Sequence, residues 1–135
     1  MPTHHRFTIL GSSSSGNSSL LETESGPVLI DAGFSAKKLD ELLQRHGHRL
    51  SAVEGIFLTH EHSDHAQGLV GLRRHNPRLP VYANYATAQA LERQLTYTPN
   101  WQIFETGRPF RFRNLTVHPF SIPHDAYDPV GSTFT

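Results

Sequence analysis

A dense group of potential metal ligands occupies one short segment of the sequence. Residues 59–65 read Thr-His-Glu-His-Ser-Asp-His, so three histidines and one aspartate fall within six positions. Neutral imidazole and carboxylate are good ligands for Zn²⁺ and similar divalent ions. The grouping favours a metal site over a polar loop in which the histidines occur by chance.

The spacing of these ligands suggests a pair of ions. A loop at the end of a strand can direct His60 and His62 toward one ion, while Asp64 and His65 reach a second. Two such ions lie about 3.5–4 Å apart, hold a hydroxide between them and lower the pKa of bound water toward ~7. We therefore expect hydrolytic chemistry, with Asp64 and His65 acting as catalytic residues and metal ligands.

The overall composition is consistent with such a site and excludes several others. The 135 residues include 10 histidines and no cysteine, which excludes thiolate metal sites, disulfides and cysteine nucleophiles. A transition-metal site must therefore be built from imidazole and carboxylate. The 12 basic and 12 acidic residues balance, which argues against nucleic-acid binding through global charge but not through a local patch.

No segment of the sequence predicts targeting or membrane insertion. The first residues lack a basic stretch followed by a long apolar one, and no apolar run approaches the ~20 residues that span a bilayer. We therefore expect a cytoplasmic protein without membrane association. The length suggests one domain, and nothing in the sequence indicates an oligomeric state.

The elements that must position the ligands are predicted from the apolar pattern. Residues 53–59 contain a short apolar run typical of a buried strand, directly before the histidine segment. Ser35 is placed to cap a helix, and residues 66–75 predict another. The small polar residues at 11–17 predict a loop. Residues that predict a β-hairpin come first, alternating strands and helices follow, and further strands come last. This order indicates a mixed sheet with helices packed on it.

Several motifs in sequence order resemble one family. The pattern His-x-His-x-Asp-His at 60–65 is the signature of the metallo-β-lactamase fold. Further motifs are similar to its YycJ/WalJ-type branch: Gly-Ser-Ser-Ser-Ser-Gly-Asn at 11–17, Leu-Ile-Asp-Ala-Gly at 29–33, Pro-Val-Tyr-Ala at 80–83, Phe-Glu-Thr-Gly at 104–107, Pro-His-Asp-Ala at 123–126 and Asp-Pro-Val-Gly at 128–131. The resemblance implies an α+β fold of αββα type, represented by its N-terminal half, with a mixed sheet and helices on one face.

The resemblance also implies a set of metal ligands. His60, His62 and His124 resemble the ligands of a first metal ion, and Asp64 and His65 resemble ligands of a second. One or two divalent ions are implied, with Zn or Mn as the metal.

Residues around these ligands also acquire roles from the resemblance. Asp31, at the end of its strand, resembles the residue that braces the metal loop through hydrogen bonds without binding metal. The loop that contains Ser14, Ser15 and Asn17 lies at the mouth of such sites. Its backbone N–H groups are suited to cradle a phosphate of the substrate.

The sequence departs from the family after His124. The fold normally supplies a bridging aspartate and a last histidine further along the chain, and Asp125 and Asp128 lie too close to His124 to serve as that later motif. By resemblance the chain holds every ligand of one metal and part of the second set. We expect residues 1–135 to form a single metallo-β-lactamase-like domain that is truncated before the last metal-ligand motifs.

Three functions follow from these observations. The first is a metal-dependent hydrolase, a phosphodiesterase or exonuclease that cleaves DNA or RNA through a metal-bound hydroxide, as the resemblance implies. The second is a thioester or lactone hydrolase of the same superfamily, since one fold supports many chemistries. The third is a non-catalytic, truncated fragment with a partial metal site, whose uncovered apolar faces favour self-association.

A group of arginines near residue 110 has two interpretations. Arg111 and Arg113 share one face of a predicted strand, and Arg108 lies nearby. They are able to contact a phosphate backbone, but solvated charges on a strand explain them more simply.

Overall fold

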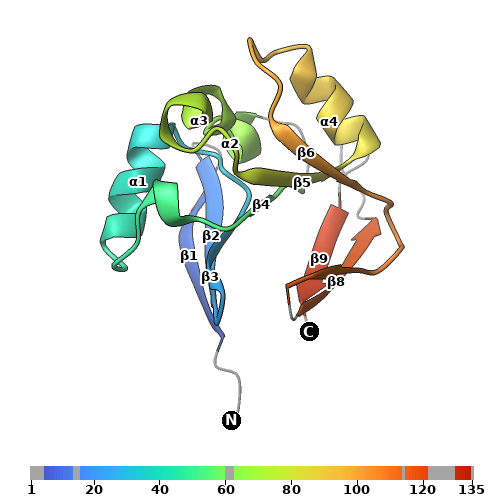
Figure 1. The fold of residues 1–135 in the computed structure, drawn as a ribbon, viewed down its shortest axis with the longest axis horizontal. Helices are drawn as coiled ribbons and strands as arrows, with labels where there is room; N and C mark the ends of the chain where they lie inside the picture. Colours follow the sequence, from blue (N-terminus) through green and yellow to red (C-terminus); the bar gives the residue numbers. More distant parts are fainter. Residues whose placement is uncertain (1–4, 14–15, 60–62, 114, 122–129, 135) are drawn as a thin grey trace.

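The structure, a computed structural model, describes five stretches of the chain (Figure 1). They are residues 5–13, 16–59, 63–113, 115–121 and 130–134. Within them the chain forms three layers: helices, a six-stranded sheet and a three-stranded sheet. The expected mixed sheet with helices on one face is confirmed.

The six-stranded sheet is the frame on which the other elements pack. Its first three strands run antiparallel, and β3 and the strands after it run parallel. In spatial order the strands are β1 (Arg6–Ser13), β2 (Gly16–Thr23), β3 (Gly26–Ile30), β4 (Ile56–Phe57), β5 (Pro80–Asn84) and β6 (Asn100–Phe104).

Helices cover one face of this sheet, and the second sheet covers the other. The helices are α1 (Ala36–Gln44), α2 (Ser63–Ala66), α3 (Leu69–His75) and α4 (Tyr85–Glu92), with a 3₁₀ turn at Leu50–Ala52. The second sheet is antiparallel and consists of β7 (Phe110–Phe112), β8 (Leu115–Ser121) and β9 (Val130–Phe134).

Side chains of the six-stranded sheet alternate between two apolar cores. Leu29 and Val81 are fully buried beneath the helices, whereas their chain neighbours Val28 and Tyr82 pack toward the three-stranded sheet. Successive side chains of a strand point to opposite faces, so a sheet covered on both sides needs apolar residues at consecutive positions. This explains the continuous apolar run of residues 56–58, of which Phe57 joins the second core.

The prediction of a loop over residues 11–17 is wrong for the described part of that segment. Gly11 to Ser13 continue β1, and Gly16 and Asn17 begin β2, with Ser13 paired to Gly16. The two glycines make room for an aromatic ring, because a Cβ atom at Gly11 or Gly16 would lie 2.2 or 2.4 Å from the ring of Phe34. Small residues here therefore serve close packing within a hairpin.

The helix predicted over residues 66–75 is two helices, α2 and α3, separated at Gln67 and Gly68. The backbone N–H of Gly68 donates to the carbonyl oxygen of Ala32 at 2.6 Å. A Cβ atom at Gly68 would lie 2.5 Å from Leu39 and 2.9 Å from the carbonyl oxygen of Phe34. This close backbone contact interrupts the helix.

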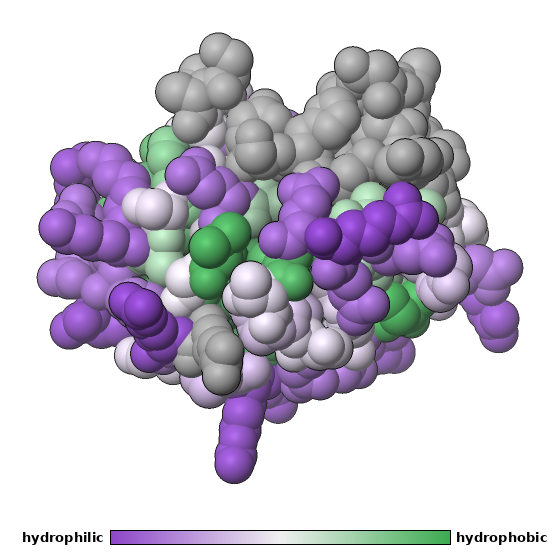
Figure 2. Space-filling model, turned by 90° about the horizontal axis from the view of Figure 1, so that it is seen from above, coloured by the Kyte–Doolittle hydropathy of each residue, from purple (hydrophilic) through white to green (hydrophobic). Residues whose placement is uncertain are grey.

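Figure 2 shows the molecule from above, relative to Figure 1. This face is largely hydrophilic, with hydrophobic residues only in small groups. Large apolar side chains that are exposed in the described ranges come from four separate elements: Phe7, Ile9, Val70, Tyr85 and Ile103. Single exposed apolar residues are ordinary on protein surfaces. None of the helices in the described ranges is long and apolar enough to cross a membrane.

Candidate metal centre

The parallel strands of the large sheet end at one common edge, and polar residues follow each of them. Asp31 comes directly after β3, Thr59 lies two residues after β4, Asn84 ends β5 and Glu105 follows β6. Ligand sites in sheets with parallel strands lie at the carboxyl ends of the strands. Thr59 is the residue that directly precedes the predicted ligand segment in the sequence.

Asp31 is the centre of a hydrogen-bond network at this edge. It is only 5% exposed, and its carboxylate accepts hydrogen bonds from the backbone N–H of Thr59 at 2.8 Å and from the Thr59 hydroxyl at 2.7 Å. Its Oδ2 lies 2.6 Å from Nδ1 of His65. The carboxylate therefore ties the end of β4 to helix α2.

The contact with Asp31 also determines the chemical form of His65. A carboxylate can only accept hydrogen bonds, so Nδ1 of His65 donates and carries the proton. In the neutral ring this leaves the lone pair on Nε2, which is the form in which imidazole binds a metal ion with its other nitrogen oriented by a carboxylate. The side chain of His65 is mostly buried, which holds the ring in place.

Backbone contacts around Asp31 bring two further segments to the same edge. The N–H of Ala32 donates to the carbonyl oxygen of His65 at 2.7 Å, and the N–H of Gly33 donates to that of Asn17 at 2.9 Å. The hydroxyl of Ser18 donates to the carbonyl oxygen of Asp31. The start of β2, with Asn17, therefore lies beside the Asp31 network.

The structure describes some of the predicted site residues and not others. His60, His62, His124, Ser14 and Ser15 lie outside the described residues. Asp64 belongs to helix α2, and its side chain also lies outside the description. In the described part of the chain no three histidine or carboxylate side chains converge to hold a metal ion. The ligand set therefore stays a prediction.

Two described features of this edge were not predicted. One is the role of Thr59, whose hydroxyl and N–H both donate to Asp31; its position directly before His60 was the available signal. The other is Asn84, which is 3% exposed, caps α4 through the N–H of Thr87 and donates to the hydroxyl of Thr106 at 3.0 Å. Asn84 is therefore the N-cap of α4.

Comparisons with known proteins agree with the fold. The family model described as beta-lactamase superfamily domain matches residues 27–134. Exodeoxyribonuclease YycJ of Bacillus anthracis is 38% identical over 130 residues, which cover 95% of this chain and 49% of the relative. Exodeoxyribonuclease WalJ of Streptococcus pneumoniae is 39% identical over 128 residues, which cover 92% of this chain and 47% of the relative.

The chain thus spans about half the length of these curated relatives. Among solved structures, a subclass B3 metallo-β-lactamase from a soil metagenome library matches with a TM-score of 0.76 at 22% identity. The match covers 95% of this chain and 54% of that one. At this identity the likeness shows the fold alone. Taken with the family match, these likenesses show that the chain belongs to the beta-lactamase superfamily, with a metallo-β-lactamase fold of the YycJ/WalJ type.

Proposed function

We propose that the protein is a metal-dependent phosphodiesterase, an exonuclease that acts on DNA. The observation that carries the proposal is the network of Asp31, Thr59 and His65, which holds one predicted ligand in its metal-binding form at the carboxyl edge of the sheet. The relatives named exodeoxyribonuclease support the choice of substrate, since they match nearly the whole chain.

The chemistry of the predicted donors suits a divalent metal ion. We propose His60, His62 and His124 as ligands of one ion, and Asp64 and His65 as ligands of a second. All five residues bind through nitrogen or oxygen atoms, which suits Zn²⁺ or Mn²⁺. The sequence has no cysteine that could supply a sulfur ligand. When bound, one or two such ions would supply water of lowered pKa and would neutralise charge on the scissile phosphate.

The described residues contribute orientation and substrate contacts. Asp31 keeps the ring of His65 in one tautomer and one position, and Thr59 holds Asp31 in turn. Asn17 lies beside this network, so we propose that it and the adjoining Ser14 and Ser15 bind a phosphate of the substrate. We also propose that residues 1–135 belong to a single metallo-β-lactamase-like domain and that the protein is cytoplasmic.

The test is degradation of end-labelled linear DNA by the purified protein with Mn²⁺ or Zn²⁺. We expect stepwise shortening that requires the metal and that is lost in His62→Ala. His46→Ala, a change at an exposed histidine next to the end of α1, should leave the rate unchanged. Equal activity in His62→Ala and the unaltered protein would refute the assignment.

Parallel assays distinguish the alternatives. An RNA of the same sequence tests the nucleic-acid class. A thioester substrate tests the second function, and its turnover without nuclease activity would replace the proposal by that function. No turnover of any substrate, with one tightly bound ion or none per chain, would favour a non-catalytic fragment.

A further inference from the structure

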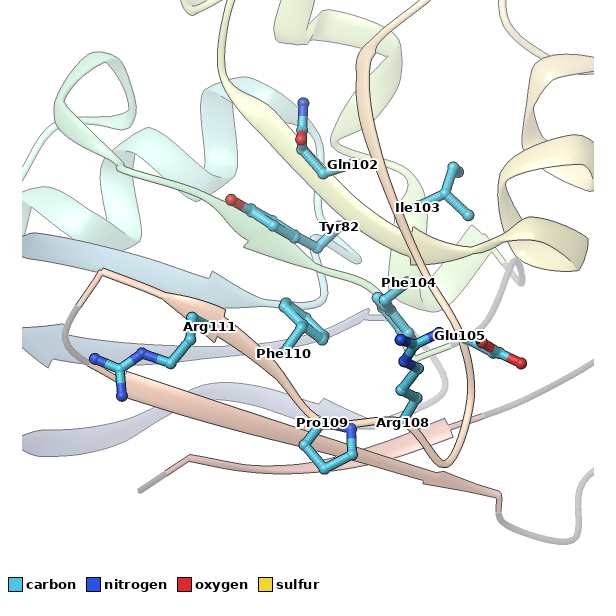
Figure 3. Close-up of a pocket in the computed structure, with 9 residues that line it drawn as sticks. All are labelled: Tyr82, Gln102, Ile103, Phe104, Glu105, Arg108, Pro109, Phe110 and Arg111. Atoms are coloured by element: carbon cyan, nitrogen blue, oxygen red, sulfur yellow. Dashed lines mark ion pairs between the residues drawn. The ribbon is translucent and has the colours of Figure 1, made fainter.

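A groove of about 450 Å³ lies on one side of the molecule, between the outer strands of its two sheets (Figure 3). Within the described residues β6 forms an edge of the six-stranded sheet and β7 an edge of the three-stranded sheet. Residues from β5, β6, β7 and the turn that joins β6 to β7 line the groove. None of these residues belongs to the predicted metal ligands.

Aromatic rings form the inner wall of the groove. The ring centroids of Tyr82 and Phe110 lie 5.8 Å apart with planes inclined by 11°, and those of Phe104 and Phe110 lie 5.3 Å apart with planes inclined by 15°. Phe110 is only half-buried. The hydroxyl of a tyrosine is protonated at neutral pH and is able to donate a hydrogen bond, and burial raises the pKa of Tyr82 further above its ordinary value.

Two arginines flank this wall. Figure 3 shows Arg108 and Arg111 on opposite sides of Phe110, with the side chain of Arg111 extending away from the rings. Arg108 pairs with Glu105 at 3.5 Å, but both side chains are largely exposed, and such pairs contribute little. Arg111 makes one exposed hydrogen bond of 3.5 Å, to Thr116. Both guanidinium groups are therefore available to an anionic ligand. Among the described residues that line the groove, Glu105 is the one carboxylate.

The groove adjoins the edge that holds the candidate metal centre. β6 is separated from β4, which leads to Thr59, by β5 alone. Neighbouring strands lie ~4.8 Å apart, so two spacings amount to about 10 Å. A chain molecule whose end reaches the metal loop therefore needs only a short further length to enter the groove.

We propose that this groove binds single-stranded DNA as a subsite next to the metal centre, an inference that rests on the proposed exonuclease function. Phosphates would pair with Arg108 and Arg111, and a base or deoxyribose would pack against the aromatic wall, as in other sites for single strands. Because the whole chain has no net charge, such a local pair of cations is what attracts the strand to this side. In this proposal Arg108 and Arg111 bind DNA phosphates and are more than solvated charges on the surface of a strand.

Binding is best measured without hydrolysis, by fluorescence anisotropy of a labelled single strand of about 12 nucleotides in EDTA, a length within the usual range for such sites. The test variant is the double substitution R108Q/R111Q. The control is R45Q/R74Q, which removes the same amount of charge from exposed positions on the helical side of the molecule. Arg45 directly follows α1, and Arg74 lies on α3. All four side chains are exposed, so both variants should fold, which the melting temperature checks.

We expect R108Q/R111Q to weaken binding at low salt by about fivefold or more. The slope of log K against the logarithm of the salt concentration should become shallower by about 1.4, because each lost phosphate contact on a single strand removes ~0.7. R45Q/R74Q should stay near the unaltered protein in both quantities. Equal losses in the two variants, no loss in either, no binding by the unaltered chain, or tighter binding of duplex than of single-stranded DNA would each overturn the proposal.

A second assay separates the groove from the proposed function. A small activated phosphodiester is too short to reach the groove. R108Q/R111Q should therefore hydrolyse it as fast as the unaltered protein, while KM for the oligonucleotide rises. If His62→Ala abolishes hydrolysis of both substrates but R108Q/R111Q changes neither binding nor KM, the exonuclease assignment stands and the groove proposal fails.

Discussion

At the scale of single residues, Asp31 carries most of the described contacts of the candidate metal centre. It adopts a positive φ of 62°, a conformation that aspartate and asparagine tolerate better than most residues. In that position its two oxygens accept from Thr59 and His65, which lie 28 and 34 residues further along the chain. The resemblance predicted a brace at Asp31, but only the folded chain identifies Thr59 as its partner.

Asp31→Asn should lower the free energy of unfolding of the metal-free protein by about 1–3 kcal/mol, because an amide cannot accept every hydrogen bond that the carboxylate accepts. Asp31→Ala should cost more, since alanine disfavours the positive φ. Urea denaturation in EDTA measures both. The control Glu41→Gln alters an exposed carboxylate on α1 and should change the free energy by less than about 0.5 kcal/mol. A loss no larger than the control's would show that the network does not stabilise the fold.

At the scale of elements, the local sequence pattern predicts where most helices and strands lie. The exceptions depend on contacts between residues that are distant in the sequence. The strand before the histidines was predicted, and so was the cap at Ser35, whose hydroxyl accepts from the N–H of Lys38. The extension of β1 and β2 into residues 11–17 and the break at Gly68 were missed, because they depend on Phe34 or Ala32, which lie elsewhere in the sequence. The link between Asn84 and Thr106 was missed for the same reason.

An ion pair joins α1 to the connection that follows it, and its contribution to the stability of the fold should depend on pH. Asp40 accepts from the guanidinium of Arg49 and from the N–H of Leu50. The hydrogen bonds from Arg49 are the largest cause that lowers the pKa of Asp40 below its ordinary value, against an opposing effect of burial. The ionised carboxyl therefore stabilises the native state above about pH 4, and this contribution is lost as the pH falls through the lowered native pKa.

Asp40→Asn should therefore cost about 1–3 kcal/mol at about pH 7, and the difference from the unaltered protein should shrink toward about pH 3. Urea denaturation across this range measures the difference. A cost that stays constant with pH would mean that the charge of Asp40 plays no part in holding Arg49 and Leu50 against α1.

At the scale of the whole molecule, one aromatic cluster joins the two sheets. Phe57 stacks on Tyr82 at 4.5 Å and meets Phe112 and Phe134 edge-on at 5.1 and 5.2 Å. The apolar pattern predicted that Phe57 is buried. It gave no indication that Phe112 and Phe134 of the second sheet pack against this ring, because their position depends on how the chain turns between β6 and β7.

Phe57→Ala should lower the free energy of unfolding by about 3–5 kcal/mol, because it removes a buried ring and leaves a cavity between the sheets. The control Phe7→Ala removes a ring that is 60% exposed and should cost far less. Thermal and urea denaturation compare the two variants. Similar costs at both positions would contradict the packing of the two sheets through Phe57.

We expect above all that the edge of the sheet after β4 holds a metal centre, and equilibrium dialysis with Zn²⁺ measures the ions bound there. We predict at least one tightly bound ion per chain. Asp31→Asn should weaken binding about 10–100-fold, and the double variant H60A/H62A should weaken it further. The control H46A/H75A removes two exposed histidines at helix ends and should bind as the unaltered protein does. Equal zinc binding by H60A/H62A and the control would contradict this expectation.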